Sequence, residues 1–232
     1  MSDLLIVVPA RGGSKGIPNK NLKKVCGESL TARAIRFGLS LNISATVMVT
    51  SDSEKILNEA NRAGAHILRK RPSELAGDLV SDVPVLRDAL FYAEEKKAKK
   101  FEILAMLQPT SPIRCVNYFL ENYHLIHQKD YSAIWSVDEV SKTFHPFKVL
   151  LSDANGVGRY AHPEGHKIVA RQQLGAAYAR NGVLYLVKRD TLIESGLMGE
   201  ELFCSVTPFN TVNIDTIKDL NKARRMLSRE KS

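Results

Sequence analysis

The sequence has few cysteines, one tryptophan and no long apolar segment. Cys26, Cys115 and Cys204 lie far apart and form no Cys-x-x-Cys pair. This argues against a disulfide framework or a zinc site and suits a reducing compartment. No stretch approaches the roughly 20 apolar residues of a membrane span, and the acidic start MSDLLIVVPAR has too short an apolar run for a signal peptide. We therefore expect a cytoplasmic protein with no membrane partner.

Acidic residues are outnumbered by basic ones. The 33 lysines and arginines against 25 aspartates and glutamates give a net charge of +8 and a pI near 9.4. Such an excess favours an anionic partner, whether nucleic acid, an anionic membrane or a small polyanionic substrate. The basic residues are dispersed, with no arginine-rich arm or aromatic stacking motif. We therefore expect no nucleic-acid partner, and keep a nucleic-acid-binding domain as an alternative.

Apolar segments of strand length alternate with helical patterns along most of the chain. This alternation predicts an α/β fold with a mostly parallel central sheet, as a single domain over residues 1–232. The expected strands cover residues 4–9, 45–50, 66–68, 102–107, 132–140 and 181–189. The expected helices cover residues 29–41, 51–64, 81–97, 114–128 and a last segment from about 216.

The segment 139–165 departs from this alternation. It mixes short apolar pieces with turn signals at Asn155-Gly156 and Pro163-Glu164, which predicts a β-rich flap that projects from the sheet. Its apolar side chains would be exposed in a lone chain, and pairing with a second copy would cover them. We therefore expect a homodimer, with this flap as the dimerisation element.

Glycine and basic residues are concentrated in one loop behind the first expected strand. This loop, VPARGGSKGIPNKN (residues 8–21), has neither the P-loop pattern nor the dinucleotide-binding glycine pattern. Its glycines let backbone N–H groups and cations approach a polyanion closely. Ligands bind such sheets at the carboxyl ends of the strands. The loop therefore predicts a phosphate site.

Further motifs follow this loop along the chain. They are RPSELAGD (71–78), LQPTSPIR (107–114), RNGVLY (180–185) and VNIDTIKDL (212–220). Together the motifs resemble those of the cytidylyltransferases that activate sialic acid and related nonulosonic acids, over residues 9–220. The resemblance implies a Rossmann-like nucleotidyltransferase domain with a small dimerisation element. It also implies Mg²⁺-dependent cytidylyl transfer from CTP to the anomeric hydroxyl of a 2-keto sugar acid, with release of pyrophosphate.

The resemblance implies a nucleotide site at the basic loop. Arg11 and Lys20 match the cations that contact the triphosphate, and Lys20 is expected to neutralise the α-phosphate in the transition state. Further nucleotide contacts are expected from Ser14, Lys15, Asn21, Arg71 and Asp82.

Two of these residues have an alternative role. Lys15 is equally consistent with a solvated loop lysine. Asp82 could accept a hydrogen bond from the cytosine amino group, or it could cap a helix over residues 83–97, and the cap is the favoured reading.

The resemblance also implies a sugar site. The expected contacts are Gln108, Thr110, Ser111, Arg171, Asn181, Tyr185 and Phe203, and core packing is an alternative for Tyr185 and Phe203. Lys148 matches a lysine of the dimerisation element that reaches the sugar site of the neighbouring subunit. Ala179 stands where some sialic-acid enzymes have arginine, and Arg180 follows it on the opposite face of a strand. The sugar is therefore left open among sialic, legionaminic and pseudaminic acids.

The segment VNIDT is the expected metal motif. Asp215 matches the Mg²⁺ carboxylate of the family, and Asn213 stands on the same face of an extended chain. Several relatives have a second aspartate at position 213, and asparagine still offers a carbonyl oxygen to a hard cation. The alternative for Asp215 is a cap for a helix over 217–229, a role that Thr216 could also fill.

Two other enzymatic or binding roles remain open at this point. An enzyme that activates the eight-carbon acid of lipopolysaccharide core is one, although its first loop usually reads closer to PARYxSTRLPGKPL. The other is a catalytically silent nucleotide-binding regulator, because Asn213 departs from the metal pattern.

Overall fold

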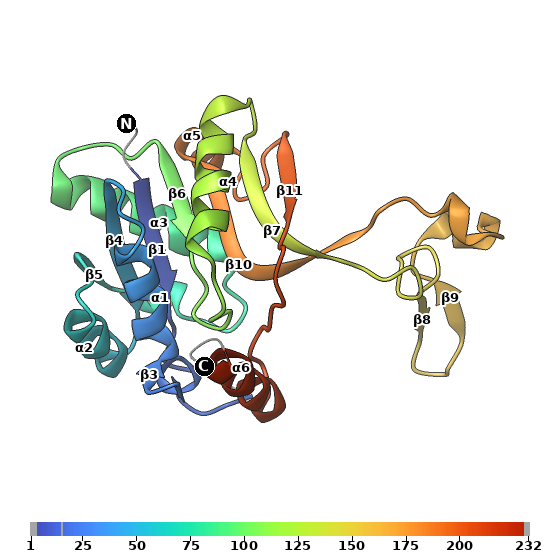
Figure 1. Ribbon diagram of the computed structural model, residues 1–232, viewed down its shortest axis with the longest axis horizontal. Coiled ribbons are helices and arrows are strands. Elements are labelled where there is room, and N and C mark those ends of the chain that lie inside the picture. Colours follow the sequence, from blue (N-terminus) through green and yellow to red (C-terminus); the bar gives the residue numbers. More distant parts are fainter. Residues whose placement is uncertain (1–3, 15, 230–232) are drawn as a thin grey trace. The chain divides into compact units, whose positions relative to one another are not determined.

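The computed structural model describes residues 4–14 and 16–229. In this range a seven-stranded sheet has the order β11-β7-β10-β6-β1-β4-β5 (Figure 1). Strand β1 pairs in parallel with β4 and β6, and β4 with β5, whereas β10 is antiparallel to β6. The expected α/β fold with a mostly parallel sheet is confirmed. The strands of the sheet are β1 (Leu4–Pro9), β4 (Ala45–Ser51), β5 (Ile67–Lys70), β6 (Ile103–Met106), β7 (Ala133–Glu139), β10 (Tyr178–Lys188) and β11 (Leu202–Val206).

Helices follow most of these strands, as the sequence pattern predicts. They are α1 (Leu30–Leu39), α2 (Glu54–Arg62), α3 (Asp82–Lys97), α4 (Val116–Gln128), α5 (Arg189–Glu194) and α6 (Ile217–Arg229). In the part of the chain that the structure describes, no helix combines the length and apolar character needed to cross a membrane. The sequence pattern missed α5, β11 and the two-residue strands β2 (Lys24–Val25) and β3 (Glu28–Ser29), which are too short to show a clear periodicity.

The sheet is buried on both faces. Side chains of β1 alternate between two hydrophobic clusters: Leu4 and Ile6 pack in one, and Leu5 and Val7 in the other. The first cluster includes residues of α1, α2 and α4, whereas the second includes residues of α3 and α5. These helices therefore form layers on opposite faces of the sheet, and the β1 segment reads as a continuous apolar run because both its faces are covered.

A third hydrophobic cluster lies beside the sheet and fixes two segments far apart in sequence. It contains Ile17 from the basic loop, Val212 and Ile214 from the VNIDT motif, and Leu220 and Leu227 from α6. Burial of these side chains holds the basic loop next to the VNIDT motif.

Residues Val137–Arg180 form a second compact unit, described here by itself. Strands β8 (Leu150–Ser152) and β9 (Gly158–Tyr160) pair antiparallel in it, and Gly156 occupies the connecting turn with φ +82°. The turn signal at Asn155-Gly156 thus marks a hairpin, in which Asp153 Oδ1 accepts hydrogen bonds from the backbone N–H groups of Asn155 and Val157 at 2.9 and 3.0 Å.

The first residues of α3 and α6 show whether Asp82 and Asp215 act as helix caps, a role that the sequence leaves open. Helix α3 begins at Asp82, and Ser81 is at its N-cap position, so the expected cap by Asp82 is wrong. At α6, Thr216 and Asp219 cap each other: Asp219 Oδ2 accepts from the Thr216 N–H at 2.8 Å, and Thr216 Oγ1 accepts from the Asp219 N–H at 3.3 Å. Thr216 is therefore the cap, and the carboxylate of Asp215 is not needed for it.

Substitution Asp219→Ala should destabilise the protein in a pH-dependent way. Hydrogen bonds from Thr216, first of all from its hydroxyl, lower the pKa of Asp219. The stabilisation is therefore fully present above the ordinary carboxyl pKa and is lost as pH falls through the lowered pKa. We expect a loss of about 0.5–2 kcal/mol at neutral pH, measured by urea unfolding, and a gap to wild type that narrows in acid.

The matched control is Asp130→Ala, because the Asp130 side chain is fully exposed. It should change the free energy of unfolding by less than about 0.5 kcal/mol. Equal losses in the two variants would contradict the capping role of Asp219.

Candidate active site

A polar cavity of about 440 Å³ opens at the carboxyl ends of β1 and β6. Its walls come from the basic loop, from residues 71–85, from the segment after β6 and from the VNIDT motif. Nine of the expected site residues line it, namely Arg11, Ser14, Lys20, Asn21, Arg71, Asp82, Gln108, Thr110 and Asp215. Lys15 lies outside the described residues. The structure therefore brings most of the expected nucleotide residues to one place.

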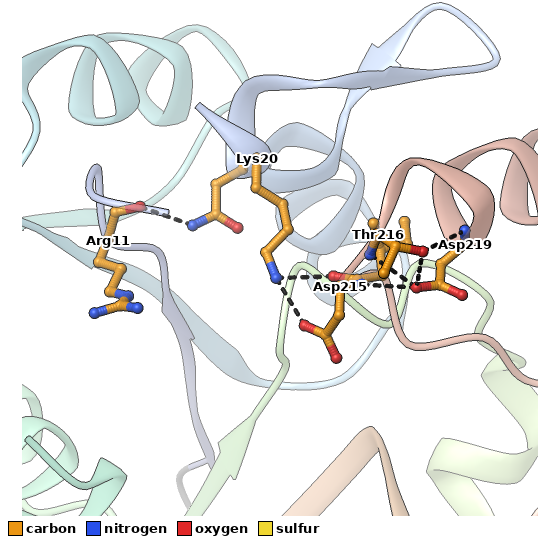
Figure 2. A network of polar contacts seen from close by, with 7 residues as sticks. Arg11, Lys20, Asp215, Thr216 and Asp219 are labelled. Carbon is orange, nitrogen blue, oxygen red and sulfur yellow. Dashed lines mark hydrogen bonds and ion pairs between the residues drawn. The ribbon is translucent and has the colours of Figure 1, made fainter. Parts of the chain in front are cut away.

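Lys20 and Asp215 form the centre of the site (Figure 2). Lys20 begins the short 3-10 helix η1 (Lys20–Leu22), and its Nζ donates to Asp215 Oδ1 and to the Ile214 carbonyl oxygen, both at 2.9 Å. The Lys20 side chain is 16% exposed, whereas that of Asp215 is 69% exposed. The site thus presents a positioned cation beside an accessible carboxylate.

Arg11 is held at the cavity by a second ion pair. Its Nη1 lies 2.5 Å from Asp78 Oδ1, and its carbonyl oxygen accepts from Asn21 Nδ2 at 2.9 Å. The next residue, Gly12, donates its N–H to Asp52 Oδ1 at 2.8 Å. Arg11 and Lys20 are therefore each paired with a carboxylate, and an incoming polyphosphate would exchange for that carboxylate as their partner.

The basic loop approaches the VNIDT motif so closely that only glycine fits at position 16. A Cβ there would lie 2.7 Å from the backbone oxygen of Asp215. The motif is also tied to the segment after β6, because the Ile214 N–H donates to the Thr110 carbonyl oxygen at 2.8 Å. Three separate loops are thus held in register around the cavity.

Arg71 contributes a buried positive charge to the cavity wall. Its side chain is 7% exposed, and its Nη2 donates to the Thr50 carbonyl oxygen at 2.9 Å. Burial lowers the pKa of Arg71, and the carboxylates of Asp52 and Asp82 oppose that effect. Asp82, in the first turn of α3, thus lies near this guanidinium and faces the cavity.

Four expected sugar contacts do not line the cavity. Ser111 Oγ donates to the Asn181 carbonyl oxygen at 2.9 Å, and Asn181 Nδ2 donates to Thr207 Oγ1 at 3.1 Å. Tyr185 is 4% exposed in the core, and Phe203 stacks on Tyr131 with ring centres 4.9 Å apart.

The residue after Asn181 lies against the cavity wall. Gly182 has φ +77°, and a Cβ there would lie 2.6 Å from both Gln108 Oε1 and Ser111 Oγ. This part of β10 therefore packs directly against Gln108, which lines the cavity.

Arg171 and Lys148 belong to the second unit. Lys148 is exposed, and the neighbouring His145 is buried against Phe147 with ring centres 5.4 Å apart. Their expected roles at the sugar site stay predictions.

The VNIDT motif has the alternating pattern expected of an extended chain. Val212 and Ile214 are buried, whereas Asn213 and Asp215 are exposed. Among the described residues, no three histidine, cysteine, aspartate or glutamate side chains are grouped to hold a metal ion. Mg²⁺ is commonly bound by one or two carboxylates together with substrate phosphates. The donor set around Asp215 fits a cation bound in that way.

Two carboxylates that hold the basic loop in place were not predicted from the sequence in that role. Asp52, which holds the Gly12 N–H, follows the last residue of β4, and the rule that polar residues after parallel strands gather at one edge could have found it. Asp78 is part of RPSELAGD, but its ion pair with Arg11 joins positions 67 residues apart, and no local pattern indicates that.

Known proteins match most of this chain in sequence. The profile of the family described as "Cytidylyltransferase" matches residues 5–230. The CMP-N,N'-diacetyllegionaminic acid synthase of Campylobacter jejuni is 29% identical, with 84% of this chain and 81% of that protein covered. The pseudaminic acid cytidylyltransferase of the same species is 28% identical over 95% of this chain and 94% of that protein.

A solved structure agrees in fold. The CMP:2-keto-3-deoxy-manno-octonic acid synthetase complexed with CTP superimposes with a TM-score of 0.72 at 16% sequence identity, covering 99% of this chain and 100% of that chain. This likeness shows the fold that the chain shares with a nucleotidyltransferase. Because the profile spans nearly the whole sequence, the chain belongs to the cytidylyltransferase family.

Proposed function

We propose that this protein transfers a cytidylyl group from CTP to the anomeric hydroxyl of a nonulosonic acid and releases pyrophosphate. The observation that carries the proposal is the cavity in which Arg11, Lys20 and Arg71 face one another beside the carboxylate of Asp215. Three cations suit a triphosphate. Membership of the cytidylyltransferase family indicates that the nucleotide is a cytidine nucleotide.

The reaction requires a displacement at the α-phosphorus. The anomeric oxygen forms a bond to this phosphorus, the bond to the bridging oxygen of the β-phosphate breaks, and the hydroxyl proton is lost to solvent or to a nearby base. Negative charge grows on the α-phosphate oxygens and on the leaving pyrophosphate. Lys20 stabilises the former, and Arg11, on the same loop, stabilises the latter, because fixed cations in a cavity need no reorganisation during the reaction.

We include Mg²⁺ as the cofactor, with Asp215 as its protein ligand and Asn213 as a neighbouring oxygen donor. When bound, this cation supplies charge neutralisation to the phosphates. Asp215 accepts a hydrogen bond from Lys20, so its carboxylate also keeps the lysine side chain directed into the cavity. Asp82 is our proposed acceptor for the cytosine amino group, since carboxylates accept from this group and Asp82 faces the cavity.

The identity of the sugar is proposed from the substrates that the relatives are named for. Those quoted above are named for legionaminic and pseudaminic acids, whereas the eight-carbon acid appears in the name of a structural neighbour that shares only the fold. We propose Gln108 and Thr110, which line the cavity, as contacts of the sugar, and Arg171 of the second unit as a further contact. We also propose a cytoplasmic location, in keeping with three unpaired cysteines.

Pyrophosphate release from CTP and Mg²⁺ should require a nonulosonic acid. We expect turnover with one or more of legionaminic, pseudaminic and sialic acid, and much slower turnover with the eight-carbon acid. The measurement is a coupled phosphate assay with each acid in turn, confirmed by mass spectrometry of the CMP-sugar. CTP consumption that is fastest with the eight-carbon acid, or absent with every acid, would overturn the proposal.

The variant Lys20→Ala tests the assigned chemistry. Loss of one charge-stabilising donor should lower kcat by about 10²–10³-fold. Lys24→Ala is its matched control, since Lys24 is an exposed lysine of β2 that does not line the cavity. Near wild-type turnover by Lys20→Ala would remove Lys20 from the mechanism.

Asp215→Asn should abolish turnover at ordinary Mg²⁺ concentrations without unfolding the protein, because Thr216 and Asp219 cap α6. Circular dichroism should be unchanged, and raised Mg²⁺ should recover part of the activity. The companion variant Asn213→Asp adds a carboxylate on the same face and should be tolerated, with a lower Mg²⁺ requirement. If Asp215→Asn unfolds the chain instead, the residue is structural.

We propose further that the protein works as a homodimer. The second unit exposes Phe144, Leu150, Leu151 and Val169 by 69, 62, 63 and 87%, respectively. A cluster of large apolar side chains in water favours association, and two-fold pairing is its commonest form. Lys148, on the same unit, would then serve the sugar site of the partner.

Mixing two inactive variants separates action in trans from action in cis. Lys148→Ala and Lys20→Ala protomers are mixed and allowed to exchange. If Lys148 acts in trans, half of the sites in a hybrid dimer keep both lysines, so activity returns. If it acts in cis, every hybrid site lacks one lysine and none returns. A monomer by sedimentation at the assay concentration would also exclude the dimer.

A further inference from the structure

A second basic hollow, separate from the active-site cavity, lies between α1 and the segment that follows β6. Its volume is about 280 Å³. Arg33 and Arg36 of α1 and Arg114 line it, together with Glu28, Phe37, Ser40 and Pro112. None of these residues lines the active-site cavity, so the hollow needs its own explanation.

The hollow holds more positive than negative charge. Glu28 is the one carboxylate among its lining residues. It forms an ion pair with Arg36, and its second oxygen lies 3.7 Å from Arg33 Nη1. Arg33 Nε also donates to the Pro112 carbonyl oxygen at 3.0 Å. The hollow is thus lined by three guanidinium groups and one carboxylate, which contacts two of them.

Arg114 is the least satisfied of the three. Its Nε donates to the Val183 carbonyl oxygen at 3.3 Å and its Nη2 to that of Gln108 at 2.5 Å. Its Nη1 is buried and, within the part of the chain that the structure describes, has no hydrogen-bond partner. Burial, together with the charge of Arg33, lowers the pKa of Arg114 to about 9. A buried N–H donor without a hydrogen-bond partner is costly, so an acceptor for Arg114 Nη1 would stabilise this arrangement.

We propose that this hollow binds a small phosphate-class anion, with Arg33, Arg36 and Arg114 as its ligands. Guanidinium groups bind phosphate oxygens in pairs through parallel N–H donors. The volume suits inorganic phosphate or pyrophosphate and is below the usual range for larger organic ligands. Arg36 is 57% exposed at the side chain, which gives the anion a route from solvent.

The same arginines hold the loop that lines the active site. Arg114 contacts the carbonyl oxygen of Gln108, and Arg33 contacts that of Pro112. An anion between these guanidinium groups would reduce their mutual repulsion and fix their positions. Binding should therefore raise the thermal stability of the protein in a saturable way.

The test measures anion binding in a chain whose active-site cavity is weakened. Titration calorimetry and thermal melts are carried out on Lys20→Ala with inorganic phosphate and, separately, with pyrophosphate. We expect one saturable site for at least one of these anions. Adding Arg36→Gln should weaken its affinity by about 10–100-fold, as for loss of a charged hydrogen bond.

Two further variants in the Lys20→Ala background make the test specific. Arg62→Gln is the matched control, because Arg62 is a 76% exposed arginine on α2 that pairs with Glu59 and does not line the hollow. It should leave the affinity unchanged. Glu28→Gln should strengthen binding, because it removes the carboxylate that competes with the anion for Arg36.

The proposal fails if neither anion shows saturable binding to Lys20→Ala. It also fails if Arg36→Gln and Arg62→Gln weaken binding equally, or if Glu28→Gln weakens it. Circular dichroism on each variant excludes unfolding as the cause of a loss, and Glu28→Gln, which predicts a gain, is decisive if Arg36→Gln does not fold. No readout depends on turnover, so failure here leaves the proposed reaction untouched.

Discussion

The site depends above all on the burial of Ile17 against the apolar side of the VNIDT motif. Ile17, Val212 and Ile214 share a hydrophobic cluster with α6. This burial brings Lys20 to 2.9 Å from Asp215 although the two are 195 residues apart. A surface ion pair alone contributes too little to hold two loops together. Apolar packing therefore places these charges at the cavity.

The parallel part of the sheet provides the rest of the arrangement. Strands β1, β4 and β6 end at the same edge, so Arg11, Asp52 and Gln108, which follow them, meet there. Opposing charges then limit the repulsion between the cations: Asp78 pairs with Arg11, and Asp215 with Lys20. The loops are thus ordered with their cations in place, which lowers the reorganisation needed when a polyphosphate binds.

The longer helices and strands could largely be predicted from the periodicity of apolar residues in the sequence. The short strands and the helix caps could not. Strand β1 and helices α1 and α3 agree with the expected ranges within a few residues. The pattern assigned the cap of α3 to Asp82, but the helix begins at Asp82 itself and Ser81 occupies the N-cap position. Cap identity depends on the backbone angles of one residue, and the residue types at 81 and 82 both suit a cap.

By itself the sequence determined the fold class, the family and the residues proposed to bind phosphate, because these follow from local periodicity and from contiguous motifs. The tertiary structure decided which of the named residues face the cavity. Lys20 and Asp215 line it, whereas Asn181 and Tyr185 are buried and do not. It also placed Arg33, Arg36 and Arg114 around a second hollow. Such placements depend on how distant segments pack, and no spacing along the chain encodes them.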